Sequence, residues 1–492
     1  MRWIAAFVAI GALAAFVVFA SLKVQAKGVC CADDAFIAHV AKNIALGEGY
    51  ISTLRDDTPT YTRRAFDPMI STGPTLVLPA AALTAVFGNA SWVPGATVVL
   101  VTLALLLAVR FALGTAVDPV RLDLAVPVFL ALCLAFTAFH LEHWYALLGE
   151  VPAALLAILA CLLPATRGLH WRTGAWSGVL LGLAFLAKTL AALYVVAFVV
   201  VVAAACSPFA PGARGRSLRA FLAAVAASFA LPVLAFESWK LVALGAHDYV
   251  RTWARFLGVA SPLAASGAAH GVASRIADGS AAFYARFGIS LLELNAVNWA
   301  AVLIARRCAR PLALFLAALA AGVTLQTAWW LLSSNGWPRY MVIGLVVSAF
   351  LATAPLFCLP RPRHAAIYLS ILAIWCIGLW PRTVAQVNDL DATSRAGLDR
   401  TVALLQNRPE ARPYVGQWWA TVADLEYRLP GSLHFRAYQA VTADDWQRGF
   451  LVVVNETFVL QDDDAFRQLL ARCGAPVHDA PPYRVYRCGG ES

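Results

Sequence analysis

The sequence predicts an all-α polytopic membrane protein with a small α/β domain at its C-terminus. The 492 residues are 61% hydrophobic and only 13% charged, whereas soluble domains carry about 25% charged residues. Apolar runs of about twenty residues, the length that a bilayer core requires, recur through residues 1–381. Only residues 382–492 have the mixed strand and helix patterns of a soluble domain.

The formal net charge of +10 does not indicate nucleic-acid binding. The basic residues stand in short breaks between apolar runs, as the orientation rule for membrane proteins predicts. They form no basic patch with interleaved aromatic residues, so a nucleic-acid partner is excluded. The charge pattern supports a multi-pass protein of the cytoplasmic membrane instead.

The apolar runs predict about eleven transmembrane helices. The run 74–87 is too short to cross and predicts a re-entrant or interfacial helix. The neighbouring spans 174–188 and 189–206 share almost no linker. The predicted spans are 3–22, 92–112, 122–139, 147–164, 174–188, 189–206, 218–237, 287–305, 311–332, 339–358 and 365–381.

An N-terminus in the cytoplasm makes every cytoplasmic break basic, in agreement with the positive-inside bias. The segments 23–73, 238–285 and 382–492 are then external, and the C-terminal tail faces the periplasm or exterior. The alternative is that the first span is a cleaved signal, because Val24-Gln25-Ala26 resembles a small-residue cleavage site.

The tail carries clear secondary-structure patterns. Phe450–Asn455 and Tyr483–Tyr486 have the β-branched and aromatic composition of strands. A small α/β domain of residues 382–492 follows from these strands and from helical patterns at 391–407, 420–429 and 462–472.

The ten cysteines divide by compartment. Cys473 and Cys488 fall in the external tail, where a disulfide between them is predicted because oxidation is possible there. Cys30 and Cys31 are adjacent, and a bridge between neighbours is strained. The other six are small core residues in or beside spans: Cys133, Cys161, Cys206, Cys308, Cys358 and Cys376.

Polar motifs recur in a fixed order near the external ends of the spans. They are Asp33-Asp34 after the first span, Ser71-Thr-Gly-Pro74, Gly149-Glu150-Val-Pro152, Gly182 to Lys188-Thr, and Gly336-Trp-Pro-Arg339-Tyr340. Over residues 1–360 this order resembles the GT-C superfamily of membrane glycosyltransferases. It is most similar to the branch with the protein O-mannosyltransferases and the lipid A aminoarabinose transferase.

The resemblance implies a GT-C type fold and a sugar donor on a polyprenyl phosphate, taken from the outer leaflet. It also implies that an acid of the first external loop is the general base. The chemistry is consistent, since an attacking hydroxyl must lose its proton to a positioned carboxylate. The leaving lipid phosphate needs cations rather than an acid, and one displacement inverts the anomeric carbon.

Asp33 matches the first acid of the family's acidic pair and is the predicted base, with Asp34 orienting it or the acceptor. A shared or swapped role is also open, because many relatives have Glu at the second position. Alternatively, one of the two carboxylates is the N-cap of a helix over 35–47.

Further candidates lie near the same surface. Glu150 begins an apolar span, where an ionisable group is functional or favoured by the helix dipole. Lys188 and Arg339, with Tyr340 beside it, could hold the lipid phosphate or snorkel to the headgroups. Arg63 and Arg64 in the first loop are a second phosphate candidate or a solvated face.

Metal binding is not predicted. His140 and His143 flank Glu142, but three residues without a fourth ligand make a weak metal site, so no cofactor is expected and a divalent ion stays open. Asn89-Ala-Ser91 and Asn455-Glu-Thr457 match the glycosylation sequon.

The predicted function is therefore transfer of a sugar from a polyprenyl-phosphate donor to lipid A, another glycan or a protein at the outer face of the membrane. A transporter of a lipid-linked or small solute is the alternative; it predicts acids near the bilayer midplane. A membrane anchor whose tail binds a partner is a third possibility, but it leaves Asp33, Asp34, Glu150 and Arg339 unexplained.

Overall fold

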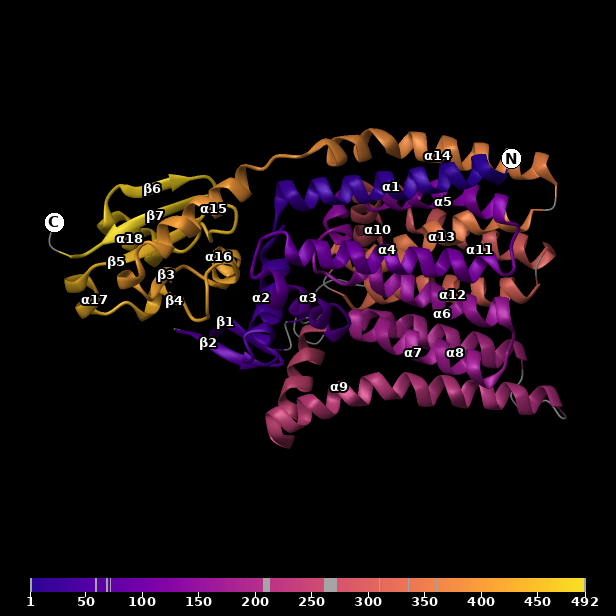
Figure 1. Cartoon of the computed structure of the whole chain (residues 1–492), viewed down its shortest axis with the longest axis horizontal. Helices are drawn as coiled ribbons and strands as arrows, with labels where there is room; N and C mark the ends of the chain where they lie inside the picture. The colour runs from indigo at the N-terminus through magenta and orange to yellow at the C-terminus, as the bar shows by residue number, and fades with distance from the viewer. Residues whose placement is uncertain are drawn as a thin grey trace.

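The computed structural model describes residues 2–57, 60–67, 70, 72–206, 213–260, 272–308, 310–334, 336–359 and 361–490. It consists of a bundle of long helices with a mixed sheet beyond one end of the bundle (Figure 1). We call that end the sheet end. Helix α2 (Ala32–Ala45), helix α3 (Pro74–Phe87) and the hairpin of β1 (Ile51–Asp57) and β2 (Thr60–Ala65) lie between bundle and sheet.

Within the described residues, eight helices are long and apolar enough to cross a membrane. A ninth span results if α10 (Val272–Phe287) and α11 (Leu291–Cys308), which meet at 76°, count as one. The eight are α1 (Arg2–Lys27), α4 (Val93–Gly114), α5 (Pro119–Phe136), α6 (Glu150–Arg167), α9 (Ala213–Ala260), α12 (Arg310–Leu332), α13 (Val342–Cys358) and α14 (Pro362–Asn388).

The all-α membrane class is thus confirmed, and eight or nine of the eleven expected spans have the full length and hydropathy of a crossing helix within the described residues. Helices α7 (Trp171–Ala187) and α8 (Ala192–Cys206) have 17 and 15 residues, and a bilayer core needs about 20. Helix α3 has 14 residues and is short, as expected. Residues 261–271 of the predicted segment 238–285 lie outside the described residues.

Helices α6 and α13 form the centre of the bundle. Both are buried along nearly their whole length, as expected for helices that are apolar on every side. The long helices α1, α9 and α14 run along the outside of the bundle and leave most of their apolar residues exposed (Figure 1). In a membrane protein such surfaces face lipid.

Three glycines let α7 approach α9 closely. A β-carbon at Gly174, Gly178 or Gly182 would meet the backbone of α9 at less than 3.0 Å, and at Gly178 it would lie 2.3 Å from the carbonyl oxygen of Val225. Their spacing of four residues places all three on one face of α7. Small residues at this spacing are typical of close helix packing in membranes.

The sheet at the C-terminus has the order β4-β3-β5-β7-β6. Strand β3 runs parallel to β4 and β5, whereas β7 is antiparallel to β5 and β6. The expected small α/β unit is present, and the two predicted strands are confirmed as β5 and β7. The elements are α15 (Thr393–Gln406), β3 (Tyr414–Gly416), α16 (Ala423–Arg428), β4 (Phe435–Ala437), α17 (Ala443–Arg448), β5 (Phe450–Asn455), α18 (Asp464–Cys473), β6 (Pro476–Ala480) and β7 (Tyr483–Cys488).

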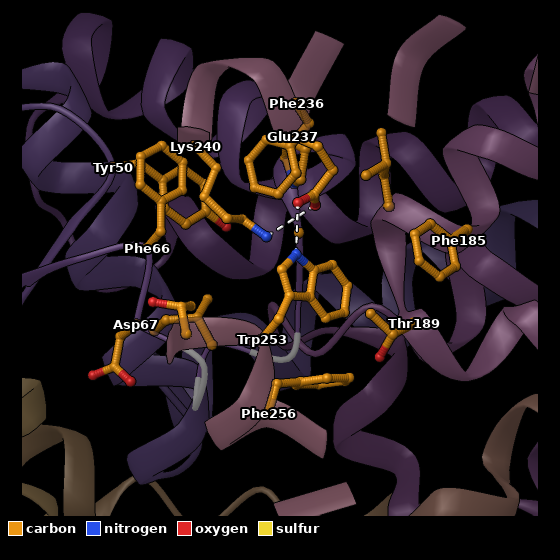
Figure 2. Close-up of a pocket in the computed structure, with 15 residues that line it drawn as sticks. Tyr50, Phe66, Asp67, Phe185, Thr189, Phe236, Glu237, Lys240, Trp253 and Phe256 are labelled. Atoms are coloured by element: carbon orange, nitrogen blue, oxygen red, sulfur yellow. Dashed lines mark hydrogen bonds and ion pairs between the residues drawn. The ribbon is translucent and has the colours of Figure 1, made fainter. Parts of the chain in front are cut away.

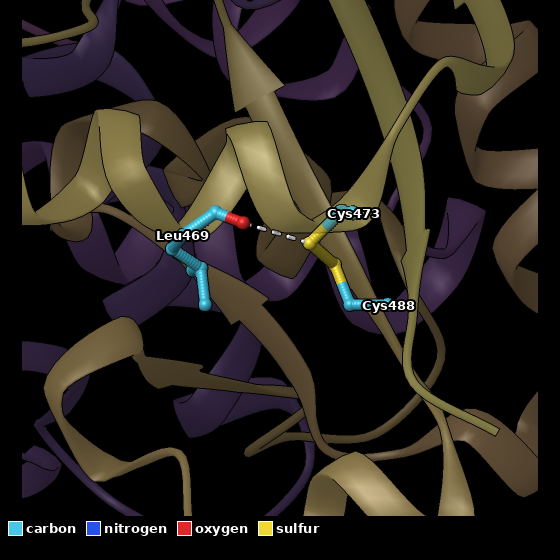
Figure 3. The surroundings of a disulfide bond; sticks show 3 residues. All are labelled: Leu469, Cys473 and Cys488. Carbon is cyan, nitrogen blue, oxygen red and sulfur yellow. Dashed lines mark hydrogen bonds between the residues drawn. A yellow bond between two sulfur atoms is a disulfide. The ribbon is translucent and has the colours of Figure 1, made fainter.

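The predicted disulfide is present between Cys473 and Cys488 (Figure 3). It ties the last residue of α18 to the last residue of β7, and the carbonyl oxygen of Leu469 lies 3.1 Å from the Cys473 sulfur. Cys30 and Cys31 are free thiols, as are Cys133, Cys161 and Cys376.

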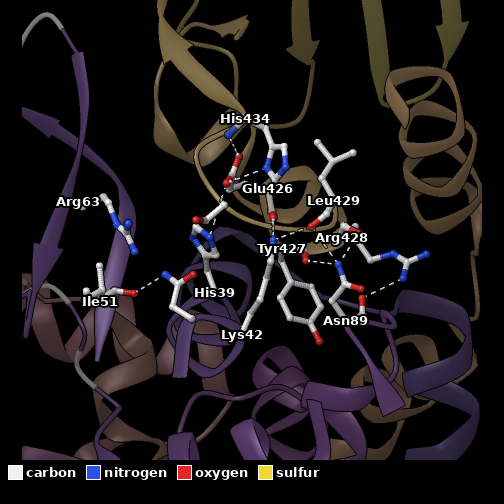
Figure 4. Close-up of polar contacts among 12 residues, drawn as sticks. His39, Lys42, Ile51, Arg63, Asn89, Glu426, Tyr427, Arg428, Leu429 and His434 are labelled. Atoms are coloured by element: carbon white, nitrogen blue, oxygen red, sulfur yellow. Dashed lines mark hydrogen bonds and ion pairs between the residues drawn. The ribbon is translucent and has the colours of Figure 1, made fainter. Parts of the chain in front are cut away.

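Buried polar side chains of the membrane part hold the C-terminal unit (Figure 4). The Lys42 ammonium of α2 donates to the carbonyl oxygens of Glu426 (2.5 Å) and Leu429 (2.6 Å), at the end of α16. A helix leaves its last carbonyls unpaired and its C-terminus partly negative, so a cation stabilises it. Burial lowers the pKa of Lys42 to about 8, which still leaves it mostly charged at neutral pH.

Asn89 completes this contact. Its amide donates to the carbonyl oxygens of Tyr427 (2.9 Å), Arg428 (2.5 Å) and Leu429 (3.1 Å). A glycan on this nitrogen would replace those bonds, so Asn89 does not serve as a glycosylation site in this fold. Asn455 of the other sequon is buried in β5.

We expect Gly178→Ala to lower the midpoint of thermal unfolding, since the new methyl group overlaps the α9 backbone and forces the helices apart. Gly378→Ala in α14 is the matched control, because a β-carbon there meets nothing within 4 Å. Alanine is favoured over glycine in a helix by about 1 kcal/mol, so the control should be neutral or stabilising. Equal midpoints for both variants would contradict the packing.

We expect peptide mapping without reductant to find Cys473 linked to Cys488. Replacing both by serine should cost about 3 kcal/mol, the value for closing a loop of about 15 residues, and should lower the unfolding midpoint of the C-terminal unit. Cys376→Ala, at a free cysteine, is the control. Two free thiols in protein isolated under oxidising conditions would refute the bridge.

Candidate functional site

The first turn of α2 carries the acidic pair. The helix begins at Ala32 after the extended residue Cys31, which makes no side-chain cap. Asp33 and Asp34 therefore lie inside the first turn, where the helix dipole favours carboxylates. The expectation that one of them is the N-cap of a helix over 35–47 is wrong.

The two carboxylates have different surroundings. Asp34 is fully buried, and its two oxygens accept hydrogen bonds from the backbone N–H groups of Cys30 (2.9 Å) and Leu147 (2.8 Å). Burial raises the pKa of Asp34 to about 6, although both bonds favour the charged form. The Asp33 side chain is 39% exposed, so Asp33 is partly open to solvent, whereas Asp34 is enclosed and bonded to two backbone segments.

Arg339 forms an ion pair with Asp33 across 306 residues of sequence. Arg339 belongs to the short 3-10 helix η4 (Pro338–Met341) before α13. Its guanidinium lies 4.3 Å from the ring centre of Trp337 and 5.7 Å from that of Tyr340, and the two rings stack at 5.9 Å. Such cation–π contacts orient the guanidinium.

Glu150 begins α6 and is buried with two partners. Its oxygens lie 2.7 Å from the Lys188 ammonium and 2.9 Å from Nδ1 of His143. Lys188 also donates to the carbonyl oxygen of Leu148 at 3.0 Å. A buried carboxylate needs such pairing, so this cluster is stable because its charges compensate each other.

The turn before α6 depends on Gly149. Its φ of +89° is left-handed, and a β-carbon would lie 2.5 Å from the carbonyl oxygen of Ala187. Only glycine fits both requirements. The turn packs the residues just before Glu150 against the end of α7, next to Lys188. Thr72 and Lys188 form a β-bridge at the same place.

His140, Glu142 and His143 lie on one 3-10 turn, η1 (Ala138–Trp144). His140 Nδ1 is 3.1 Å and His143 Nε2 is 3.9 Å from Oε1 of Glu142. Burial lowers the pKa of His140. Burial would raise the pKa of Glu142, but the His140 hydrogen bond and the nearby His143 lower it overall, so Glu142 is charged.

Arg63 and Arg64 occupy the hairpin. Arg63 forms an ion pair with Glu48, whose carboxylate also accepts from the Ser432 hydroxyl at 3.0 Å. Arg63 thereby connects the hairpin to the C-terminal unit. Arg64 stands opposite Ser52 in the β1–β2 register.

A partly open pocket lies between the start of α3 (Gly73 and Pro74) and the end of α7 (Phe185 and Leu186). Figure 2 shows the rings of Phe236 and Trp253 beside the Lys240–Glu237 pair, with Phe256 beyond Trp253. Lys240 is 2.9 Å from Glu237, and its ammonium lies 4.8 Å from the Trp253 ring centre. Lys240 and Glu237, two charges three residues apart after an apolar run, are not among the site residues predicted from the sequence.

At the sheet end, the partly exposed pair of Asp33 with Arg339 lies near the buried pair of Glu150 with Lys188. The Glu150 carboxylate also acts electrostatically on Arg339. An accessible carboxylate can accept a proton, and an accessible guanidinium can bind phosphate oxygens.

Comparison with known proteins gives a match in structure alone. No protein-family model matches the chain, and no curated protein sequence matches it. The crystal structure of ArnT from Cupriavidus metallidurans bound to undecaprenyl phosphate is similar over 99% of both chains, with a TM-score of 0.63 and 14% identity. The apo form gives 0.57 at 13% identity, again over 99% of both chains.

An oligosaccharyltransferase from Archaeoglobus fulgidus, tethered with an acceptor peptide, gives a TM-score of 0.48 at 14% identity over 81% of this chain and 58% of the other. The full-length agreement with ArnT covers both the helical bundle and the C-terminal sheet. The chain therefore has the fold of the GT-C membrane glycosyltransferases.

Proposed function

We propose that the protein transfers a sugar from a polyprenyl-phosphate donor to a hydroxyl of an envelope lipid, glycan or protein at the outer face of the cytoplasmic membrane. The observation that carries this is the contact between Asp33, a candidate base about a third exposed, and Arg339, a candidate phosphate-binding residue that is also about a third exposed. The fold supports it, because the similar ArnT structure holds undecaprenyl phosphate.

In this proposal Asp33 is the general base. Its carboxylate takes the proton of the acceptor hydroxyl as that oxygen attacks the anomeric carbon. The bond between the anomeric carbon and the phosphate oxygen breaks, and the polyprenyl phosphate leaves with the electron pair. Because one displacement occurs on the face opposite the leaving group, the product has inverted configuration.

In the proposed reaction Arg339 binds two anionic partners, one after the other. Without donor, its guanidinium holds the Asp33 carboxylate and occupies the oxygen that must receive the proton. The donor phosphate is an anion and competes for the same guanidinium. Binding of donor thus stabilises the leaving group and frees the base in one event, while Trp337 and Tyr340 keep the guanidinium in place.

The buried residues position this pair. Asp34 fixes the first turn of α2 through its two backbone bonds. Glu150 and Lys188 neutralise each other behind Arg339 and shape the surface that the phosphate approaches. These charges gather at the sheet end rather than midway along the spans, which favours group transfer over transport.

The proposal assigns residues 1–381 to the membrane module and residues 382–492 to an external domain. The C-terminal unit stands against α2 through Lys42 and Asn89, directly beyond the helix that carries Asp33. It therefore lies on the side from which an acceptor reaches the site. Arg63, at the contact of hairpin and C-terminal unit, borders the same approach.

We expect Asp33→Asn to retain the wild-type unfolding midpoint and to lose about two to four orders of magnitude in turnover, the usual cost of a lost general base. Asp34→Asn should instead unfold earlier. Its amide NH₂ replaces one acceptor and faces a backbone N–H, which costs about 1–3 kcal/mol. Asp118→Asn, at an exposed helix cap of the opposite end, is the control.

The assay supplies purified variants with undecaprenyl-phosphate-linked pentoses and hexoses and follows transfer to membrane glycans, lipids and proteins. Near-normal turnover by Asp33→Asn would remove Asp33 from the chemistry. Failure of the wild-type protein with every donor would refute the function.

We expect Arg339→Ala to bind undecaprenyl phosphate at least about tenfold more weakly, because a charge-assisted contact is worth about 1.5–3 kcal/mol. Asp33→Asn should bind it more tightly than the wild type, since the guanidinium no longer has a competing carboxylate. Arg363→Ala, exposed at the start of α14, should change nothing. If Asp33→Asn and the wild type bind undecaprenyl phosphate equally tightly, the proposed exchange of Arg339 from Asp33 to the donor phosphate is wrong.

A further inference from the structure

His140, Glu142 and His143 have the spacing of metal ligands. Each offers one ligand atom, and the three atoms lie within 4.8 Å of one another. Ligands of a tetrahedral zinc ion stand about 3.4 Å apart, which follows from bonds of about 2.1 Å. The two distances to Oε1 of Glu142, 3.1 and 3.9 Å, bracket that value, so small side-chain movements would close the site.

The surroundings of His143 are those of a metal-bound imidazole. A ligating histidine usually donates its second ring nitrogen to a carboxylate, which fixes its orientation. Here Nε2 of His143 faces Glu142, while Nδ1 lies 2.9 Å from Oε2 of the buried Glu150. Glu150 is in turn held by Lys188, so the orientation of His143 is fixed by two layers of contacts.

Burial and charge support the same conclusion. His140 and His143 are 8% and 1% exposed, so an ion held between them would be largely shielded from water. The Glu142 side chain is 31% exposed, so the cluster has a path to solvent and one negative charge.

We propose that His140, Glu142 and His143 form a binding site for a divalent transition-metal cation, with water at the fourth position. Two imidazoles and a carboxylate suit zinc, cobalt or nickel rather than magnesium, which prefers oxygen ligands alone. Three protein ligands with an open fourth position match catalytic rather than structural zinc sites. The cation would connect to Glu150 through His143, beside the proposed transfer site, and its binding needs no sugar donor.

The test uses the full-length protein in detergent, purified through an affinity tag without histidines and stripped with a chelator. Titration with Co²⁺ should give one equivalent per chain and the visible absorption of a four-coordinate ion. Zn²⁺ should displace it, and excess Mg²⁺ should not. Glu142→Gln and His140→Ala should each weaken Co²⁺ binding at least about tenfold, whereas His247→Ala, an exposed histidine of α9, should not.

Glu142→Gln preserves shape at a half-exposed position, so its unfolding midpoint without metal should equal that of the wild type and confirm an intact fold. The proposal is overturned if the wild type binds no stoichiometric Co²⁺. It is overturned equally if Glu142→Gln and His140→Ala bind as tightly as the wild type, because the ion would then be held elsewhere. Either result leaves the proposed transferase function untouched.

Discussion

The Asp34 carboxylate is the contact on which the geometry of the sheet end depends. It is fully buried and joins the turn before α2 to the loop before α6 through two backbone N–H groups. A buried carboxylate without such bonds would cost several kcal/mol, so the two segments cannot separate without a large penalty. Asp33 precedes Asp34 in the same turn, so the direction of its side chain toward Arg339 is fixed as well. The loop before α6 also positions His143 and Glu150.

The same helix also positions the C-terminal unit. His39 and Lys42 follow Asp34 by more than one turn of α2. Their side chains point from α2 toward Glu426 of the C-terminal unit (Figure 4). Burial lowers the pKa of His39 to about 3, so it is neutral there. Polar contacts of this kind are specific in direction, unlike apolar packing, and they fix the C-terminal unit relative to the acidic pair.

The two acid–cation pairs differ in burial, and therefore in the role that we propose for each. Glu150 and Lys188 are almost completely enclosed, and breaking a buried pair leaves an uncompensated charge at a cost of about 3–5 kcal/mol. Asp33 and Arg339 are each about a third exposed, so water and a phosphate can replace either partner at little cost. An exchange of partners during a reaction is therefore possible for the exposed pair, while the buried pair gives the site a constant shape.

The sequence alone determined the membrane class, the strands β5 and β7, the Cys473–Cys488 bridge and the acidic and basic motifs, because apolar run length and strand composition are local properties. It left the roles of Asp33 and Asp34 open to a swap, did not pair Lys188 with Glu150, and left Asn89 as a glycosylation candidate. Those features depend on contacts between distant segments: Leu147 with Asp34, Lys188 with Glu150 and α16 with Asn89. The proposed metal site also depends partly on sequence and partly on tertiary structure. The spacing of His140, Glu142 and His143 can be read from the sequence. The contact of His143 with the Glu150 carboxylate depends on how the turn at Gly149 folds, which only the tertiary structure decides.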